Sequence, residues 1–211
     1  MIEILLFTLT AFAVGFSGSL VPGPMLTVTI RDSLKKGFKA GPLVVFGHIV
    51  AELVLVALIF AGFSWLIGSK TASIFIGTFG GLTLVLMGFQ TVRSPADLPT
   101  SSEVEDSTQS YGSILGGFIS SVSNPYFFIW WATIGCAFIS KGLELAGFLG
   151  VLAFFVGHWA SDLGWYSFVS FFTGKGSEVI NRHHYKLIMI VCGVFLIFLG
   201  IYFILSAQKT I

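Results

Sequence analysis

Long apolar stretches alternate with short polar segments along most of this chain. The pattern predicts membrane-spanning helices, because about 20 apolar residues in a row are enough to cross the hydrocarbon core of a bilayer. Six such spans cover residues 3–29, 41–67, 71–92, 112–139, 144–172 and 186–206. No small-residue cleavage site follows the first apolar stretch, so we interpret it as a retained helix and not as a signal peptide. We therefore expect an all-α membrane protein that lies in a lipid bilayer.

Composition supports this class. Of the 211 residues, 55% are hydrophobic and only 10% are charged, and the mean hydropathy is +0.93. No soluble domain of this length has such a balance. The net charge of +1 comes from basic residues scattered over short loops, so nothing indicates a nucleic-acid partner.

Basic residues are unevenly divided between the two predicted sides of the membrane. One side holds Arg31, Lys35, Lys36, Lys39, Arg93, Lys175, Arg182 and Lys186, whereas the other holds only Lys70, Lys141 and Lys209. Cytoplasmic loops carry the excess of Lys and Arg. We therefore expect a multi-pass plasma-membrane protein with both termini outside and the connector 93–111 in the cytoplasm.

The polar, acidic connector 93–111 separates two halves, 1–92 and 112–211, which hold three predicted spans each. An odd number of spans forces the two halves to insert with opposite orientation, which is the plan of an inverted repeat.

The first span of each half is interrupted by proline, at Pro22-Gly23-Pro24 and at Asn124-Pro125. A helix is kinked or unwound at such positions, and backbone groups freed inside a bilayer must face protein or a water-filled cavity. The two breaks therefore predict a binding site at mid-membrane. Half-helices that begin at Pro24 and Pro125 offer free N–H groups and a positive dipole to that site.

The second span of each half carries the same five-residue frame, Gly47-His48 with Glu52 and Gly157-His158 with Asp162. A carboxylate at membrane depth costs about 2.5–3.5 kcal/mol on insertion scales, so these residues are candidates for a functional site. A histidine and an acid four residues apart share a helix face, and such a pair can take up and release a proton.

Two interpretations of these frames remain open at this point. The pairs belong to one site built from the two halves, which we favour, or they are hydrogen-bonded staples between helices that never titrate. Trp130 and Trp131 follow the second break, where either a cavity position or lipid contact suits them.

The chain resembles the LysE/RhtB (lysine exporter) family of small six-span exporters of amino acids and related metabolites. The resemblance rests on Pro22-Gly23-Pro24, on the stretch 37–41 and on Asn124-Pro125. Tyr126 stands where many members have lysine, and the His-x-x-x-acid frame suggests a distinct subgroup. The resemblance implies an exporter that is driven by the proton gradient and forms a homo-oligomer.

We accordingly predict a secondary transporter that exports an amino acid or a related zwitterionic or cationic metabolite by proton antiport. The substrate carboxylate would lie at the half-helix N-termini and its ammonium near Glu52 or Asp162. No Lys or Arg lies at membrane depth to hold an anion. No cofactor is expected. The main alternative is a divalent metal ion as the substrate, with the ligands His48, Glu52, His158 and Asp162.

Enzymatic and redox roles are not expected. The His-Glu-x-x-His motif of an intramembrane metalloprotease is absent. Cys136 and Cys192 have no counterpart in the other half, so we interpret both as packing residues.

Overall fold

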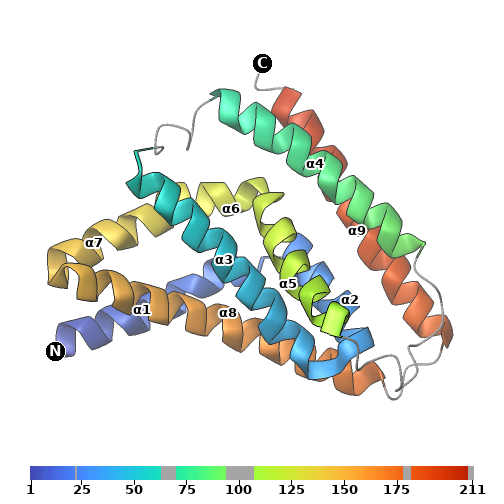
Figure 1. Cartoon of the computed structure of the whole chain (residues 1–211), viewed down its shortest axis with the longest axis horizontal. Coiled ribbons are helices and arrows are strands. Elements are labelled where there is room, and N and C mark those ends of the chain that lie inside the picture. Colours follow the sequence, from blue (N-terminus) through green and yellow to red (C-terminus); the bar gives the residue numbers. More distant parts are fainter. Residues whose placement is uncertain (22, 63–69, 94–106, 178–181, 209–211) are drawn as a thin grey trace.

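Every regular element in the described part of the chain is a helix. The computed structural model describes residues 1–21, 23–62, 70–93, 107–177 and 182–208 (Figure 1). Five helical segments in it are long and apolar enough to cross a membrane, namely Ile2–Ser19, Pro24–Phe60, Ile74–Val92, Pro125–Ala146 and Ile190–Gln208. The prediction of an all-α membrane protein is confirmed.

The first predicted span is divided into two helices, α1 (Ile2–Ser19) and α2 (Pro24–Lys36). Gly23 caps α2 in an extended conformation, with φ −158° and ψ −174°, and Pro24 occupies the first turn. Proline suits this position because its missing N–H would have no partner within the helix. The break thus lies where the sequence predicted it, although Pro22 itself lies outside the described residues.

The fourth predicted span is divided in a similar way. α5 (Ser107–Val122) ends before Asn124, and α6 (Pro125–Trp130) continues through a π-helical segment, Trp131–Gly135, into α7 (Cys136–Ala146). The side chain of Asn124 accepts a hydrogen bond of 3.1 Å from the backbone N–H of Tyr126, which is a typical helix N-cap.

Two expected boundaries in this half differ from the structure. Residues 107–111, assigned to the connector, already belong to α5, while 94–106 lie outside the described residues. The expected loop between 139 and 144 is helical, because α7 continues to a turn at Gly147, whose φ of 58° favours glycine.

The two frames lie on α3 (Ala40–Phe60), which follows a 3₁₀ turn at Gly37–Lys39, and on α8 (Phe148–Ser177). α8 corresponds to the predicted span 144–172 but is not among the five apolar segments, because polar residues such as His158 and Asp162 lower its hydropathy. Its 30 residues still extend over about 45 Å, more than the thickness of the hydrocarbon core.

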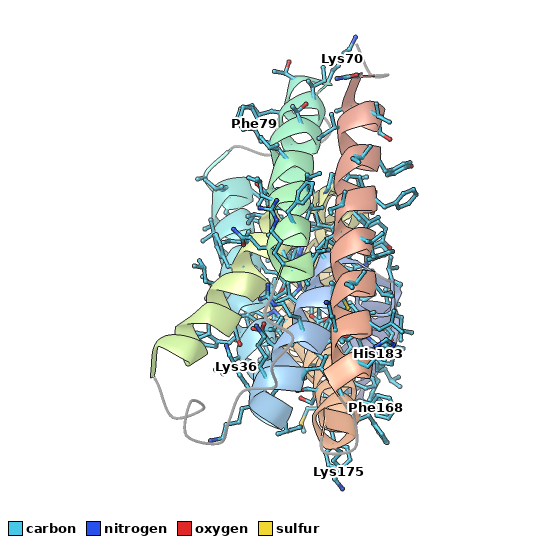
Figure 2. The ribbon with its side chains drawn as sticks, turned by 90° about the vertical axis from the view of Figure 1, so that its right-hand side faces the viewer. Lys36, Lys70, Phe79, Phe168, Lys175 and His183 are labelled. Carbon is cyan, nitrogen blue, oxygen red and sulfur yellow. The ribbon has the colours of Figure 1, made fainter. Side chains whose placement is uncertain are left out.

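Figure 1 shows α1 beside α8 and α3 across α5, so each frame-bearing helix packs on the first helix of the other half. The third spans, α4 (Lys70–Val92) and α9 (Arg182–Gln208), lie side by side as a separate pair. In Figure 2, Lys36 and Lys175 lie toward one end of the molecule and Lys70 lies at the opposite end. The predicted orientation requires this separation, because it places Lys36 and Lys175 on the cytoplasmic side of the membrane and Lys70 on the outer side.

The glycine of each frame is a point of close approach in these helix pairs. A Cβ atom on Gly47 would overlap the backbone carbonyl of Ile114 in α5, and one on Gly157 would overlap that of Thr8 in α1. The two contacts hold α3 and α8 against their partners one residue before each histidine, and they thereby help to fix the positions of both histidines.

We expect Gly47→Ala and Gly157→Ala to destabilise the protein by about 1–3 kcal/mol each, since a backbone atom must move to admit the methyl group. The measurement is thermal unfolding of the purified protein in detergent. Gly164→Ala is the matched control, because nothing lies within 4 Å of a Cβ at that position of α8. Equal unfolding temperatures for all three variants would show that the close contacts do not matter.

Candidate functional site

The histidine and the acid of both frames meet in the interior of the protein. One nitrogen or oxygen of each lies within 4.8 Å of the corresponding atoms of the others. We call this group the buried tetrad, and it consists of His48, Glu52, His158 and Asp162. The tetrad brings together side chains of α3 and α8, which the sequence placed in opposite halves.

Glu52 lies at the centre of the tetrad and is 1% exposed. Its Oε1 lies 2.8 Å from Nε2 of His158 and 3.1 Å from Nε2 of His48. The indole N–H of Trp131 donates to Oε1 over 3.1 Å, and that of Trp159 donates to Oε2 over 2.7 Å. Both carboxylate oxygens of Glu52 are therefore held by neighbouring groups.

Asp162 differs from Glu52 although it stands at the equivalent place of its frame. It is 2% exposed, and its Oδ2 lies 3.5 Å from Nε2 of His158 and 3.8 Å from Nε2 of His48. Neither contact has the geometry of a hydrogen bond, so this buried oxygen has no hydrogen-bond partner. Asp162 is therefore the acid of the tetrad that can receive a ligand.

The ring of His48 is oriented by α5. Its Nδ1 lies 2.7 Å from the hydroxyl of Ser121, which itself donates to the carbonyl of Gly117 over 2.7 Å. A hydroxyl has one proton to donate, so Nδ1 of His48 is the donor toward Ser121. Nε2 of a neutral His48 then carries a lone pair, which faces Glu52 Oε1 at 3.1 Å. Because two lone pairs repel each other, this contact requires a proton or another cation between the two atoms.

The ring of His158 is held by aromatic stacking. Trp130 lies parallel to it at 4.6 Å with an interplanar angle of 19°, and Phe154 lies at 5.7 Å with an angle of 14°. Trp130 is fixed in turn by a hydrogen bond of 3.1 Å from its indole N–H to Ser17 Oγ. Nδ1 of His158 is buried and has no hydrogen-bond partner.

The tetrad lines a cavity of about 240 Å³ that also reaches both helix breaks. The cavity wall includes Gly23, Pro24 and Asn124, whereas Pro125 is adjacent to it and Pro22 lies outside the described residues. The remaining wall is largely aromatic, and no Lys or Arg is among its described residues. It includes Tyr126, Phe127, Trp130, Trp131 and Tyr166, together with Leu199 and Phe203 of α9.

Sequence reasoning did not find several residues of this site, and two of these form hydrogen bonds with the tetrad. Trp159 directly follows His158, and its contact with Glu52 could not be inferred from that adjacency. Ser121 belongs to the serine-rich stretch before the second break, and nothing in that stretch indicated a contact with His48.

A second group of charged residues ties α2 to α5 near the end that carries Lys36. The Ser113 hydroxyl donates to Asp32 Oδ2 over 2.7 Å, and Lys36 Nζ donates to Ser113 Oγ over 2.7 Å. Arg31 Nε donates to Asp32 Oδ1 over 2.8 Å. Asp32 is 4% exposed, so this group closes the space between the two helices.

Comparisons with known proteins agree with this architecture. The family model described as LysE type translocator matches residues 16–207. The chain is 24% identical to the "Putative amino acid efflux protein YcgF" of Bacillus subtilis over 92% of this chain and 93% of that protein. It is 27% identical to the "Chemotactic transduction protein ChpE" of Pseudomonas aeruginosa over 74% of this chain and 77% of that protein.

No solved structure matches this chain. The family model nevertheless covers both helix breaks, both frames and most of α9, so it spans all the elements that form the cavity. The chain is a multi-pass membrane transporter that belongs to the LysE type translocator family.

Proposed function

We propose that this protein exports an amino acid or a related zwitterionic or cationic small metabolite, in exchange for protons, through the cavity between its two halves. Membership of a translocator family supports transport, and a relative described as a putative amino acid efflux protein supports this substrate class. The homo-oligomer that the resemblance implies is part of the same proposal.

The observation that carries the proposal is the unpartnered Oδ2 of Asp162 in the cavity wall. A buried carboxylate oxygen without a donor is costly, and a substrate ammonium would supply the missing hydrogen bonds. The absence of Lys and Arg from the described cavity wall disfavours a purely anionic substrate.

The N-terminus of α2 is suited to the other end of a zwitterion. Gly23, Pro24 and Met25 line the cavity, and no side chain caps the helix. Free N–H groups and the positive end of the helix dipole attract carboxylates at such a position. A substrate that lies between α2 and Asp162 would therefore have both charges paired.

Alternating access would use the two halves as inverted repeats. In one helix pair, α8 of the second half packs on α1 of the first half. In the other, α3 of the first half packs on α5 of the second half. This symmetry supports the arrangement. The group of Arg31, Asp32, Lys36 and Ser113 would close the cavity on the predicted cytoplasmic side and would separate when the cavity opens there.

The test is efflux from proteoliposomes loaded with one labelled amino acid at a time and placed in an acidic external buffer. We expect at least one zwitterionic or cationic amino acid to leave faster than from protein-free liposomes, and a protonophore to remove the acceleration that the pH gradient produces. Efflux equal to that of protein-free liposomes across the whole panel would refute the substrate class. Efflux that is indifferent to the protonophore would refute the exchange for protons.

A further inference from the structure

We propose that the buried tetrad binds a divalent transition-metal ion, represented by Zn²⁺, through one atom of each of its four side chains. Two imidazole nitrogens and two carboxylate oxygens suit ions of this class. In the described part of the chain, no other group of three or more His, Cys, Asp and Glu residues converges in this way. The binding goes beyond the export proposed above. Because both would use Oδ2 of Asp162, a bound ion and a substrate ammonium would exclude each other at this atom.

The spacing of the four ligand atoms carries the first part of the argument. Nitrogen and oxygen alternate around a ring, with successive separations of 2.8, 3.1, 3.8 and 3.5 Å. A tetrahedral ion with ligand distances of about 2.0–2.2 Å requires neighbouring ligand atoms about 3.3–3.6 Å apart. A tetrahedron requires this spacing for all six pairs. The four observed separations lie on both sides of the range and all six pairs lie within 4.8 Å, so side-chain shifts that also shorten the longest separations would complete the coordination.

One unpartnered oxygen and one histidine nitrogen of the ring carry the second part. Oδ2 of Asp162 is buried without a hydrogen bond. Nε2 of His48 faces Glu52 Oε1, while its Nδ1 is engaged by Ser121. A cation at the centre of the ring would satisfy both atoms at once, since a metal ion accepts the lone pairs of a neutral imidazole and of a carboxylate.

The surroundings of the ring resemble the outer shell of a metal site. Trp131 and Trp159 donate to the two oxygens of Glu52, and Ser121 engages the outer nitrogen of His48. Such contacts orient metal ligands and fix the imidazole tautomer. His158 is oriented by its stacking on Trp130 instead. The cavity gives the ion a path to all four ligands.

The test is calorimetric titration of the detergent-purified full chain, carrying an affinity tag without histidine, with Zn²⁺. We expect one tightly bound ion per chain, and an affinity at least about 100-fold lower after His158→Ala. His183→Ala, which removes an exposed histidine of α9, should leave the affinity unchanged. Co²⁺ should give the visible absorption bands of tetrahedral coordination.

Asp162→Asn provides a second variant in case His158→Ala does not fold, because the aspartate oxygen that would bind the ion has no hydrogen bond to lose. Zn²⁺ should raise the unfolding temperature of the wild type but not that of this variant. Wild-type protein without saturable Zn²⁺ binding would overturn the proposal. So would a folded His158→Ala or Asp162→Asn variant that binds Zn²⁺ as tightly as the wild type.

Discussion

Asp162→Asn is expected to lower export about 30-fold at subsaturating substrate while the protein stays folded. Asparagine keeps the shape of the side chain but removes the charge that would pair with a substrate ammonium. The loss of one partner of a buried charge pair costs about 2 kcal/mol or more, which corresponds to about 30-fold weaker binding. Because Oδ2 of Asp162 has no hydrogen bond in the structure, the fold loses little by the change.

The measurement compares initial efflux rates of the wild type and Asp162→Asn in proteoliposomes that contain equal amounts of protein. Unfolding temperatures of both proteins in detergent separate a transport defect from misfolding. Gly164→Ala, on the same helix and away from packing contacts, serves as the control for a neutral substitution. Wild-type efflux by Asp162→Asn would remove this carboxylate from the substrate site.

Glu52→Gln is expected to destabilise the protein strongly and to stop export as a consequence. Both oxygens of Glu52 accept hydrogen bonds, from Trp131 and His158 on one side and from Trp159 on the other. A glutamine places an NH₂ group against an N–H donor in either orientation of its amide. Removing one partner of a buried, hydrogen-bonded ion pair costs about 3–5 kcal/mol.

For a protein of this size, that cost corresponds to an unfolding temperature roughly 6–20 °C lower. Thermal unfolding of Glu52→Gln beside Asp162→Asn, under the same conditions, tests the expectation directly. The two substitutions are the same chemical change at equivalent places of the two frames, so each is the matched control of the other. Equal unfolding temperatures would contradict the different roles that the structure gives to the two acids.

The difference between these acids arises from their neighbours. The glutamate side chain is one methylene longer and reaches the indole groups of Trp131 and Trp159, which come from different helices. The aspartate side chain is shorter, and its Oδ2 lies 3.5 and 3.8 Å from the two imidazoles without forming a hydrogen bond. One carboxylate is thereby a fixed part of the structure, and the other remains available to a ligand.

Much of the fold could be predicted because its causes are local. Apolar runs partition into a bilayer wherever they occur, and Pro24 and Pro125 interrupt a helix whatever surrounds them. Helix ends were less predictable. Residues 107–111 and the stretch around Lys141 are helical although their polarity suggested loops, since a helix can extend beyond the hydrocarbon core into water.

The amino-acid sequence alone predicted a helical membrane protein whose first and fourth spans are broken by proline, and it placed two His-x-x-x-acid frames within apolar segments. Each of these features follows from the chemistry of neighbouring residues. The folded arrangement determined that the frames meet, that Trp159 and Ser121 join them, and that Asp162 keeps an unpartnered oxygen. Such features depend on contacts between helices that are far apart in the sequence, so no local pattern encodes the distances between their side chains. These distances are fixed by the close approach of α3 to α5 at Gly47 and of α8 to α1 at Gly157.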